Sequence, residues 1–457
     1  MNNLLRNSLL LLVLTLAQAV SAQVQVALRG PVGGDRLLEL ARSNPDMRVL
    51  DLSEAVIEGN LIPAGVFAGS KLERIVLPAT GSITIGDGAF MSSALTEIIL
   101  PESVVAVGQG AFASCTELRS AVISGAEIGS HAFHLCSALE TAALGNSSAL
   151  GGHAFEGCVA LKKVEHNNAL QLIGEHAFTD CAALQKFIFP APLTRIGDHA
   201  FAHSGLIVAD MTPCGDLQTV GAWAFASDAD LTVVKFPSDA ILGDGVLFNC
   251  PSIRHLELPA ALKAVPAFAF TGSTGSNGYH RLPDTVETIG AMAYKDSDLG
   301  HIVLPASLTE IGSHAMANTP RLAIIDAGNV ARVPELGSDV WAGVDKSLVV
   351  LEVADELRDD FRNALQWQDF KIEKSGISDP ETAPVDVRFA FSDHDLIIEA
   401  PVDIIQVEIY NESGACFLNS TLSSETVSIP TDGMNLRIFL VRCVLSDGTV
   451  ATAKLSR

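Results

Sequence analysis

The sequence is poor in the features on which nucleic-acid-binding and carbohydrate-binding proteins depend. Its 457 residues include three tryptophans and three tyrosines, and its formal net charge is −24. Such an acidic chain lacks the basic footprint that nucleic acids and anionic membranes require, so neither is expected as a partner. The scarcity of flat aromatic rings disfavours sugar binding as the main activity, because sugars commonly stack on such rings.

The sequence also lacks the spacings of the common catalytic centres. It contains no Gly-x-Ser-x-Gly, no His-Glu-x-x-His, no Walker loop and no calcium-loop pattern. Its eight cysteines include no Cys-x-x-Cys pair and no Cys/His spacing typical of zinc. Carboxylates are scattered at repeat spacing, so no pair stands out as acid and base. We therefore predict that the protein is not an enzyme and has no catalytic residue, no cofactor and no metal ligand.

One repeated unit fills most of the chain. The stretch 173–190 reads IGEHAFTDCAALQKFIFP, and close variants precede and follow it. The repeats align on a large residue that follows a small one, which we call the plug, at spacings of 21 to 25 residues. The plugs are Phe67, Phe90, Phe112, Phe133, Phe155, Phe178, Phe201, Phe225, Phe248, Phe270, Tyr294, Met316 and Trp341. A fixed period in the twenties with a Leu-x-x-Ile-x-Leu core predicts a leucine-rich-repeat solenoid.

Each repeat contains the signals for one short strand and one turn. Leu184, Phe187 and Phe189 occupy the Leu-x-x-Ile-x-Leu positions, and their alternation with polar residues is typical of a half-buried strand. Proline often ends the strand, and the glycine of the following Ile-Gly pair is expected to have a positive φ. No unit can bury its apolar residues alone, so the units must stack. We expect a right-handed, curved, β-rich solenoid whose strands line the concave face.

The remaining segments define the predicted domains. Residues 1–22 combine a charged start, an apolar run and a small-residue cleavage site, which predicts a secretory signal peptide; an uncleaved anchor is the alternative. No later apolar run is long enough to cross a membrane. A short amphipathic helix in residues 23–48 forms an N-terminal cap, followed by the solenoid at 49–353. A C-terminal cap helix is expected at 354–374, a linker at 375–384 and a small antiparallel β-sandwich at 385–457.

Cysteines recur at one position beside the plug. Cys115, Cys136, Cys158 and Cys181 lie three residues after it, and Cys250 lies two after Phe248. We interpret them as a ladder of buried, reduced thiols, because free cysteine behaves as a small core hydrophobe. A redox or metal ladder is the alternative. Outside the repeats, Cys416 and Cys443 would be able to form a disulfide in an exported protein.

Histidines recur two residues before the plug, at His131, His153, His176, His199 and His314. Because successive repeats stack these rings, a metal-binding or pH-sensing ladder is one interpretation. We favour the other, a turn position that tolerates polar residues, because a stack of like rings lacks the converging geometry of a zinc site.

The outward positions of the predicted strands carry the candidate binding residues. Together with their flanking positions they form a locally basic zone of Lys162, Lys163, Lys186, Lys235, Arg254 and His255, which we expect to contact an acidic protein surface. Ordinary solvated lysines are the alternative. A Gly/Ser-rich segment after Phe270 is either a degenerate repeat or a binding loop that presents Tyr279 and His280.

The unit Ile-Gly-x-x-Ala-Phe-x-x-Cys-x-x-Leu-x-x-Ile-x-Leu-Pro resembles the BspA-type leucine-rich repeat of bacterial surface proteins, from about Val49 to Val353. The segments 405–414, 438–442 and 454–455 resemble the C-terminal sorting domain of the type IX secretion pathway; a structural Ig-like module is the alternative. These resemblances imply an exported protein, at the cell surface or secreted, that adheres to host matrix proteins or to other bacterial surface proteins. A structural, envelope-associated solenoid without a specific ligand is the alternative function, and a hidden hydrolase is the least favoured.

Overall fold

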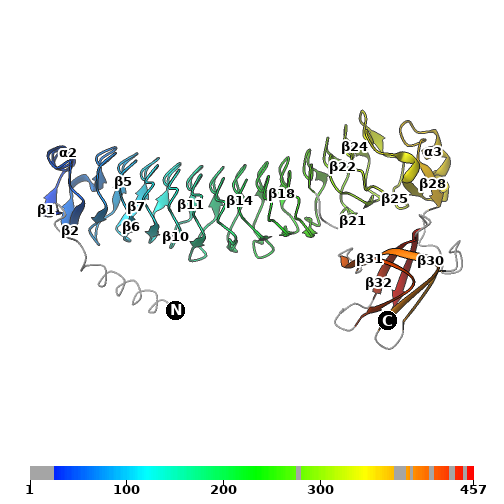
Figure 1. Ribbon diagram of the computed structural model, residues 1–457. Helices are drawn as coiled ribbons and strands as arrows, with labels where there is room; N and C mark the ends of the chain where they lie inside the picture. Colours follow the sequence, from blue (N-terminus) through cyan, green and yellow to red (C-terminus); the bar gives the residue numbers. More distant parts are fainter. Residues whose placement is uncertain are drawn as a thin grey trace. The chain divides into compact units, whose positions relative to one another are not determined.

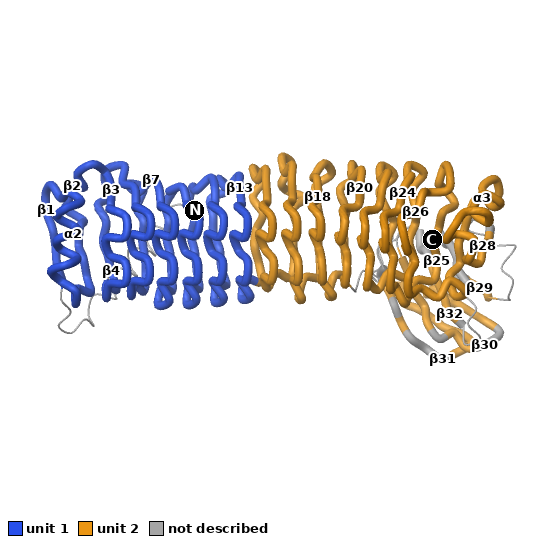
Figure 2. Tube along the Cα trace, turned by 90° about the horizontal axis from the view of Figure 1, so that it is seen from above, with its two compact units in different colours: residues 1–184 blue, residues 185–457 orange. Residues whose placement is uncertain are grey.

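A computed structural model describes residues 25–273, 279–374, 387–391, 395–410, 416–431, 438–445 and 450–456. The chain divides into two compact units, residues 1–184 and 185–457 (Figure 2). In both units the repeats are successive rungs of short parallel strands (Figure 1). The predicted signal peptide and linker lie outside the described residues. Among the residues that are described, no helix is long and apolar enough to span a membrane.

Unit 1 begins with an end cap made of a strand and a helix. Strand β1 (Gln25–Val32) pairs in parallel with β2 (Val49–Ile57), and helix α2 (Gly34–Ser43) connects them. The helix buries Leu37 and Leu40, as its leucine spacing predicts. The sequence did not predict β1, because its Gly-Pro pair is untypical of a strand. Because β1 is an edge strand, its proline, which has no N–H, does not interrupt the hydrogen bonds of a central strand.

Two series of parallel strands run through the rungs of unit 1. The strands of the Leu-x-x-Ile-x-Leu core are β4 (Arg74–Val76), which pairs with β2, and then β6 (Glu97–Leu100), β8 (Ser120–Ile123), β10 (Thr141–Ala143) and β12 (Lys163–Glu165), which form one sheet. A 3-10 helix (Glu58–Asn60) precedes the second series. That series is β3 (Leu61–Ile62), β5 (Ile83–Ile85), β7 (Val104–Val107), β9 (Glu127–Ile128), β11 (Ala149–Leu150) and β13 (Leu172–Ile173).

Unit 2 contains two strand series of the same kind. The first contains two sheets: β15 (Val208–Asp210), β17 (Val233–Lys235) and β19 (His255–Glu257), then β21 (Tyr279–Arg281), β23 (His301–Val303), β25 (Ile324–Ala327), β27 (Val350–Val353) and β28 (Lys371–Lys374). The second contains β14 (Arg195–Ile196), β16 (Thr219–Val220) and β18 (Ile241–Leu242), then β20 (Ala264–Val265), β22 (Thr288–Ile289), β24 (Glu310–Ile311) and β26 (Glu335–Leu336).

The C-terminal cap is helical only in part. Two 3-10 helices (Lys346–Leu348 and Asp355–Leu357) and the short helix α3 (Arg358–Asn363) occupy the region, and strand β28 ends it. The predicted cap helix over 354–374 is therefore present only at 355–363; residues 371–374 form β28 instead, because they pair with β27 and extend the sheet. The predicted anchor Trp367 is buried, and its ring packs on Trp341 at 5.1 Å between centroids.

The C-terminal domain is an antiparallel sheet with its own core. Its strands are β29 (Arg388–Phe391), β30 (Asp395–Tyr410), β31 (Cys416–Pro430), β32 (Ile438–Leu445) and β33 (Val450–Ser456). Antiparallel pairing was predicted, but β30 joins two segments that the sequence separated, with a register shift between Glu399 and Ile404. Cys443 is buried in the core. The side chain of Cys416 is not among those described, so a disulfide between the two stays a prediction.

The plugs confirm the repeat register, with one correction. In unit 1 the rings of Phe112, Phe133 and Phe155 stack at 5.1 and 5.2 Å between centroids, and all three are fully buried. In unit 2, however, Leu247 rather than Phe248 fills the plug position. The backbone N–H of Leu247 donates to the next turn as the other plugs do, whereas Phe248 is half-buried against Trp223.

The thiol ladder is buried, as predicted. Cys115, Cys136, Cys158, Cys181 and Cys250 have no exposed surface and form no disulfide. Each thiol donates to a backbone carbonyl of an earlier plug, as when Cys136 Sγ lies 3.1 Å from Phe112 O. Burial raises the pKa of Cys158 to about 12, so its thiolate is suppressed and a redox role is disfavoured. Cys250 obeys the same three-residue spacing once Leu247 is taken as its plug.

The glycine of the Ile-Gly pair has a different role from the one predicted. Gly129 and Gly151 do not have positive φ. A Cβ at Gly129 would lie 2.6 Å from Val107 O, so glycine is required by the close approach of successive turns. Positive φ falls two residues later, with values of 59° at His131 and 60° at His153. The histidine slot is therefore part of a turn, which by itself does not decide between the two interpretations of its side chains.

Candidate binding surface

The outward side chains of the first strand series form what we call the strand face of each unit. Parallel register places them in straight rows. In unit 1, Thr141 is the partner of Lys163. In unit 2, one row contains Val208, Val233 and His255, and the next contains Asp210, Lys235 and Glu257. Adjacent members of a row are about 4.8 Å apart, so several can contact one ligand.

The predicted basic residues of unit 1 lie on this face or at its edge, but both are paired with acids. Lys162 Nζ lies 3.0 Å from Glu140 Oε2, and Lys163 Nζ lies 2.5 Å from Glu165 Oε1. Both lysines are exposed. Exposed ion pairs of this kind add little stability, but they reduce the charge that a lysine offers to a partner.

The basic residues of unit 2 divide into paired and unpaired groups. Glu257 accepts hydrogen bonds from Lys235 and His255, both at 2.7 Å. The hydrogen bond to Glu257 raises the pKa of Lys235. Lys186 and Arg254 are exposed, and neither forms an ion pair with any residue that the structure describes.

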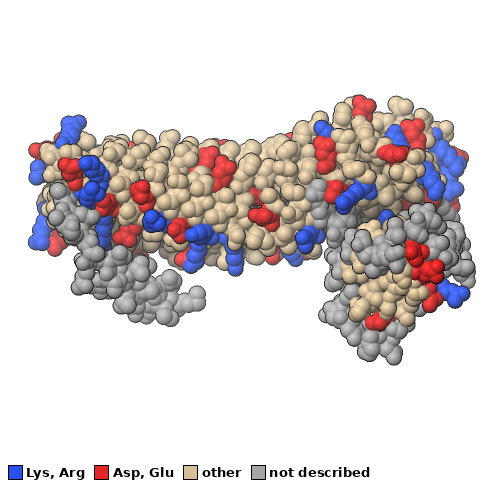
Figure 3. Space-filling model, in the orientation of Figure 1, with Lys and Arg blue, Asp and Glu red and all other residues tan. Residues whose placement is uncertain are grey.

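The expected basic zone is therefore largely neutralised within each unit. Four of its six predicted members are paired with carboxylates: Lys162, Lys163, Lys235 and His255. Figure 3 shows one face of the molecule, on which Lys and Arg side chains and Asp and Glu side chains are scattered among wide areas of other residues. Charge alone therefore does not identify the strand face as a binding surface.

Sequence reasoning overlooked an apolar component of the same surface. Ile188 and Val208 lie on the strand side of unit 2 with 63% and 43% of their surface exposed. Lys186 bridges to Val208 in parallel, which places the cation beside the apolar pair. Both side chains occupy outward strand positions in the sequence, so the signal is present in the repeat pattern.

The predicted binding loop is described only at its edges. Residues 274–278 and the side chain of Tyr279 lie outside the description. His280 is the middle residue of β21, and its ring contacts Phe270 and Tyr294 at centroid distances of 5.6 and 5.3 Å. Desolvation lowers the pKa of His280 to about 4. Its ring faces the core of its repeat, contrary to the expectation that it would be presented by a loop.

A shallow hollow of about 410 Å³ adjoins the other end of this strand. Arg281 lines it and forms an ion pair of 3.7 Å with Asp284. Leu304, Pro305 and Asn329 complete much of its wall. The volume suits a small side chain of a partner, and the mixed lining offers a cation, a carboxylate and apolar contacts.

One buried carboxyl in unit 2 leads to a prediction about pH. Asp228 is fully buried, its Oδ2 lies 3.1 Å from Ser204 Oγ, and its Oδ1 has no hydrogen-bond partner among the described residues. Burial raises its pKa well above the usual value of 3.8. A raised folded pKa means that the carboxyl stabilises the fold below pH 3.8 and loses that stabilisation as pH rises toward the folded pKa.

We therefore expect Asp228→Asn to stabilise the protein, and to do so more at pH 8 than at pH 5. The neutral amide cannot ionise, so it avoids the cost of a buried charge. Removing a buried, poorly paired carboxyl is worth about 1–3 kcal/mol. Urea unfolding at both pH values measures the difference. Asp216→Asn, at an exposed position, serves as the control and should show no such trend. An Asp228→Asn effect that is independent of pH would contradict the assignment.

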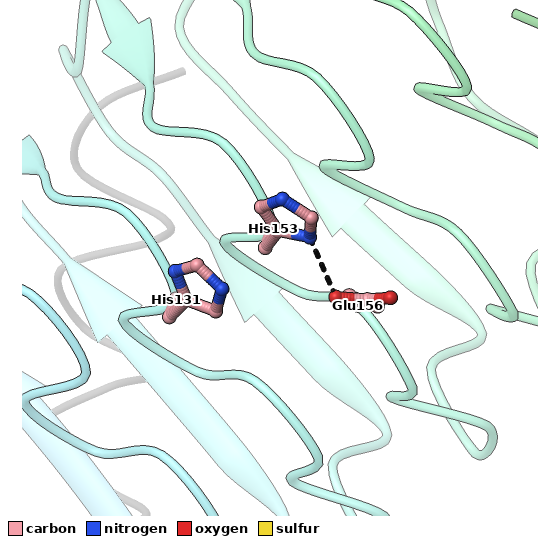
Figure 4. A group of neighbouring side chains, drawn as sticks. All are labelled: His131, His153 and Glu156. Carbon is pink, nitrogen blue, oxygen red and sulfur yellow. Dashed lines mark hydrogen bonds and ion pairs between the residues drawn. The ribbon is translucent and has the colours of Figure 1, made fainter.

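One group of metal-ligating side chains lies close together among the residues that the structure describes. It consists of His131, His153 and Glu156, all in unit 1 (Figure 4). We predicted no metal ligands from the sequence because the histidine position, taken alone, offers only a stack of like rings. Glu156 comes from a different position, the residue that follows the plug.

Comparison with known proteins agrees with the repeat architecture. The family model described as "BspA type Leucine rich repeat region" matches residues 60–164, 148–277 and 274–342 in six copies. No curated protein matches the sequence.

One solved structure supports the same fold. A leucine-rich repeat protein from Bacteroides ovatus is 20% identical, with a TM-score of 0.54 over 77% of this chain and 92% of that one. A leucine rich cell surface protein from Faecalibacterium prausnitzii is 21% identical, with a TM-score of 0.37 over 67% of this chain and 88% of that one.

Proposed function

Because the chain belongs to the BspA-type leucine-rich-repeat family, we propose that it is an exported, non-enzymatic binding protein whose strand face holds protein ligands at the cell surface or after secretion. The observation that carries the proposal is the exposed apolar pair Ile188 and Val208 beside Lys186, a cation with no ion pair to any described residue. A second such cation, Arg254, precedes β19, two strands further along the same face. Exposed apolar groups rimmed by charge are typical of protein-interaction sites.

A rigid strand face is well suited to such a role. Its backbone is fixed by parallel pairing between β15, β17 and β19, so few residues need to be ordered when a partner binds. Ile188 and Val208 would supply the apolar contact. Lys186 and Arg254 would select an acidic partner, and their attraction would be short-ranged and salt-sensitive because the chain as a whole is acidic.

The proposal predicts that charge reversal at the unpaired cations weakens binding. The double variant Lys186→Glu, Arg254→Glu should reduce capture of extracellular matrix proteins or bacterial surface proteins about tenfold or more, since it places like charge opposite an acidic partner. The melting temperature should change little, because exposed cations add little stability. Capture on immobilised partner proteins at two salt concentrations measures the effect.

Lys162→Glu, Lys163→Glu is the matched control for that experiment. Its cations are already paired with Glu140 and Glu165, so a smaller loss is expected. If the Lys186/Arg254 double variant binds as well as the unmodified protein, the strand face of unit 2 is not the binding surface.

A structural solenoid without a specific ligand is the second candidate. The pairing of most strand-face cations with carboxylates favours it, because a surface whose charges are satisfied internally offers less to a partner. Absence of any captured protein that depends on Ile188 or Val208 would support this function over the first.

The C-terminal antiparallel domain has a proposed role in export. We propose that residues 385–457 form a sorting domain of the type IX secretion kind. Its independent core, which includes Leu396, Ile398 and Val407, supports a separately folding module. Deletion of residues 385–457 should leave the repeat region folded but prevent its appearance at the cell surface. Normal surface delivery of the truncated chain would favour a structural module.

A further inference from the structure

Two adjacent turns of unit 1 each contribute two side chains to one cluster. His131 and His134 come from the first turn, and His153 and Glu156 come from the next; we call them the histidine quartet. Backbone hydrogen bonds fix the turns against each other, with the N–H of His131 donating to Gly152 O and that of Phe133 to Ala154 O, both at 2.8 Å. The quartet therefore has a frame set by the solenoid itself.

The four side chains contact one another around a closed circuit. The rings of His131 and His153 stack at 4.4 Å, and those of His131 and His134 meet edge to face at 5.4 Å. Glu156 Oε2 lies 2.7 Å from His153 Nδ1 and 3.4 Å from His134 Nε2 (Figure 4 shows all but His134). The carboxylate of Glu156 thus joins His153 to His134, whose rings come from successive turns.

His131 has an unsatisfied atom within this circuit. Its Nδ1 is buried and has no hydrogen-bond partner among the described residues. An unpaired buried nitrogen is costly and needs an explanation, of which a bound ion is one. Burial, together with the neighbouring His153 and His134, lowers the pKa of His131 against the opposing influence of Glu156 and Glu175.

We propose that the histidine quartet binds one divalent transition-metal ion of the zinc class. Three imidazole nitrogens and one carboxylate oxygen are a donor set that Zn²⁺ prefers, whereas Ca²⁺ and Mg²⁺ prefer oxygen alone. The ligand atoms of His131, His153 and Glu156 lie within 4.8 Å of one another. A tetrahedral ion with bonds of about 2.1 Å holds its ligand atoms about 3.4 Å apart, so side-chain rotations of up to about 1.4 Å bring these three atoms to that spacing. His134 lies outside this group of three and must rotate further to become the fourth ligand.

The next turn shows why the site is local rather than a ladder. His176 stacks on His153 at 4.7 Å, but its Nδ1 lies 3.2 Å from the hydroxyl of Thr179, which occupies the place of a carboxylate. A hydroxyl is a weak zinc ligand beside a carboxylate. The bound ion would join two successive turns and stabilise the folded chain in proportion to its occupancy.

Titration of the full chain with Zn²⁺ alone by calorimetry tests the proposal. We expect one ion per chain at pH 7.5, and weaker binding at pH 5.5 because protons compete for the imidazoles. His153→Asn should weaken binding at least tenfold, since loss of even a supporting group around a metal costs about 10–100-fold. Asparagine tolerates the positive φ of this turn, so the fold should persist. Glu156→Gln should have a similar effect, and Glu156→Asp should restore part of the affinity.

His176→Asn is the matched control, because it changes the same turn position one repeat further along and should leave the affinity within about threefold of the unmodified value. Co²⁺ gives a second readout, since its visible absorption reports tetrahedral nitrogen and oxygen ligation. The proposal is overturned if no stoichiometric binding occurs, or if His153→Asn and Glu156→Gln bind as tightly as His176→Asn. The quartet would then be a hydrogen-bonded cluster only.

Discussion

Replacing Phe133 by alanine is expected to lower the free energy of unfolding by about 3–5 kcal/mol. Phe133 is fully buried and stacks between Phe112 and Phe155, at 5.1 and 5.2 Å between ring centroids. Its loss would leave a cavity inside a column whose backbone is held by hydrogen bonds to both neighbouring turns, so the column cannot collapse. Each repeat is stabilised by its neighbours, and the damage should extend to them. Urea unfolding followed by circular dichroism measures the effect.

Phe248→Ala is the internal control for this prediction. The residue is also a phenylalanine, but it is half-buried against Trp223, and Leu247 takes the plug position. We expect well under half the cost of Phe133→Ala. Equal costs for the two variants would show that the repeat register derived from the plugs is incorrect.

Gly151→Ala is also expected to destabilise the fold strongly, but by adding an atom to a crowded site rather than by leaving a cavity. A Cβ at this position would lie 2.5 Å from Gly129 C and from Ser130 N, both backbone atoms of the preceding turn. Backbone atoms cannot rotate away, so the two turns must separate and the hydrogen bonds between them must lengthen. Overpacking of this kind costs about 1–3 kcal/mol or more. Thermal unfolding and hydrogen exchange at His131 and Phe133 would detect the loss.

Gly215→Ala separates this steric effect from the general consequence of replacing glycine. A Cβ at Gly215 would meet no atom within 4 Å, and its φ is not positive. We expect that variant to be neutral or slightly stabilising, because alanine restricts the unfolded chain. If Gly151→Ala were equally neutral, close approach of the turns would not be the reason for glycine there.

The architecture was predictable because one pattern recurs in many registers. Periodicity alone identified the buried plugs and the thiol ladder, which depend on contacts within and between identical units. It failed where a repeat departs from the consensus. At Leu247 the plug position holds a leucine, and the neighbouring Phe248 was mistaken for the plug; at Lys371–Lys374 a strand forms where a helical pattern was expected. The strand depends on pairing with β27, which the local pattern does not encode.

The candidate sites were less predictable because they combine positions that periodicity treats separately. The sequence showed His131 and His153 at one slot, but the slot after the plug, with His134 and Glu156, was not considered with it. Likewise Glu257 lies two residues after His255 and therefore on the same side of its strand. Its contact with Lys235 depends on the register between β17 and β19. Only the three-dimensional structure brings such positions together.

The most direct test of ligand binding on the strand face places a photo-crosslinking amino acid at Val208 or at Ile241. The two side chains are both apolar and exposed in unit 2, but Val208 lies on β15 of the strand face, whereas Ile241 lies on β18 of the other strand series. The proteins would be irradiated with purified matrix proteins and bacterial surface proteins. Strand-face binding predicts a crosslink from position 208 that excess unlabelled protein abolishes, and none from position 241. Crosslinks from 241 alone, or equally from both positions, would contradict it.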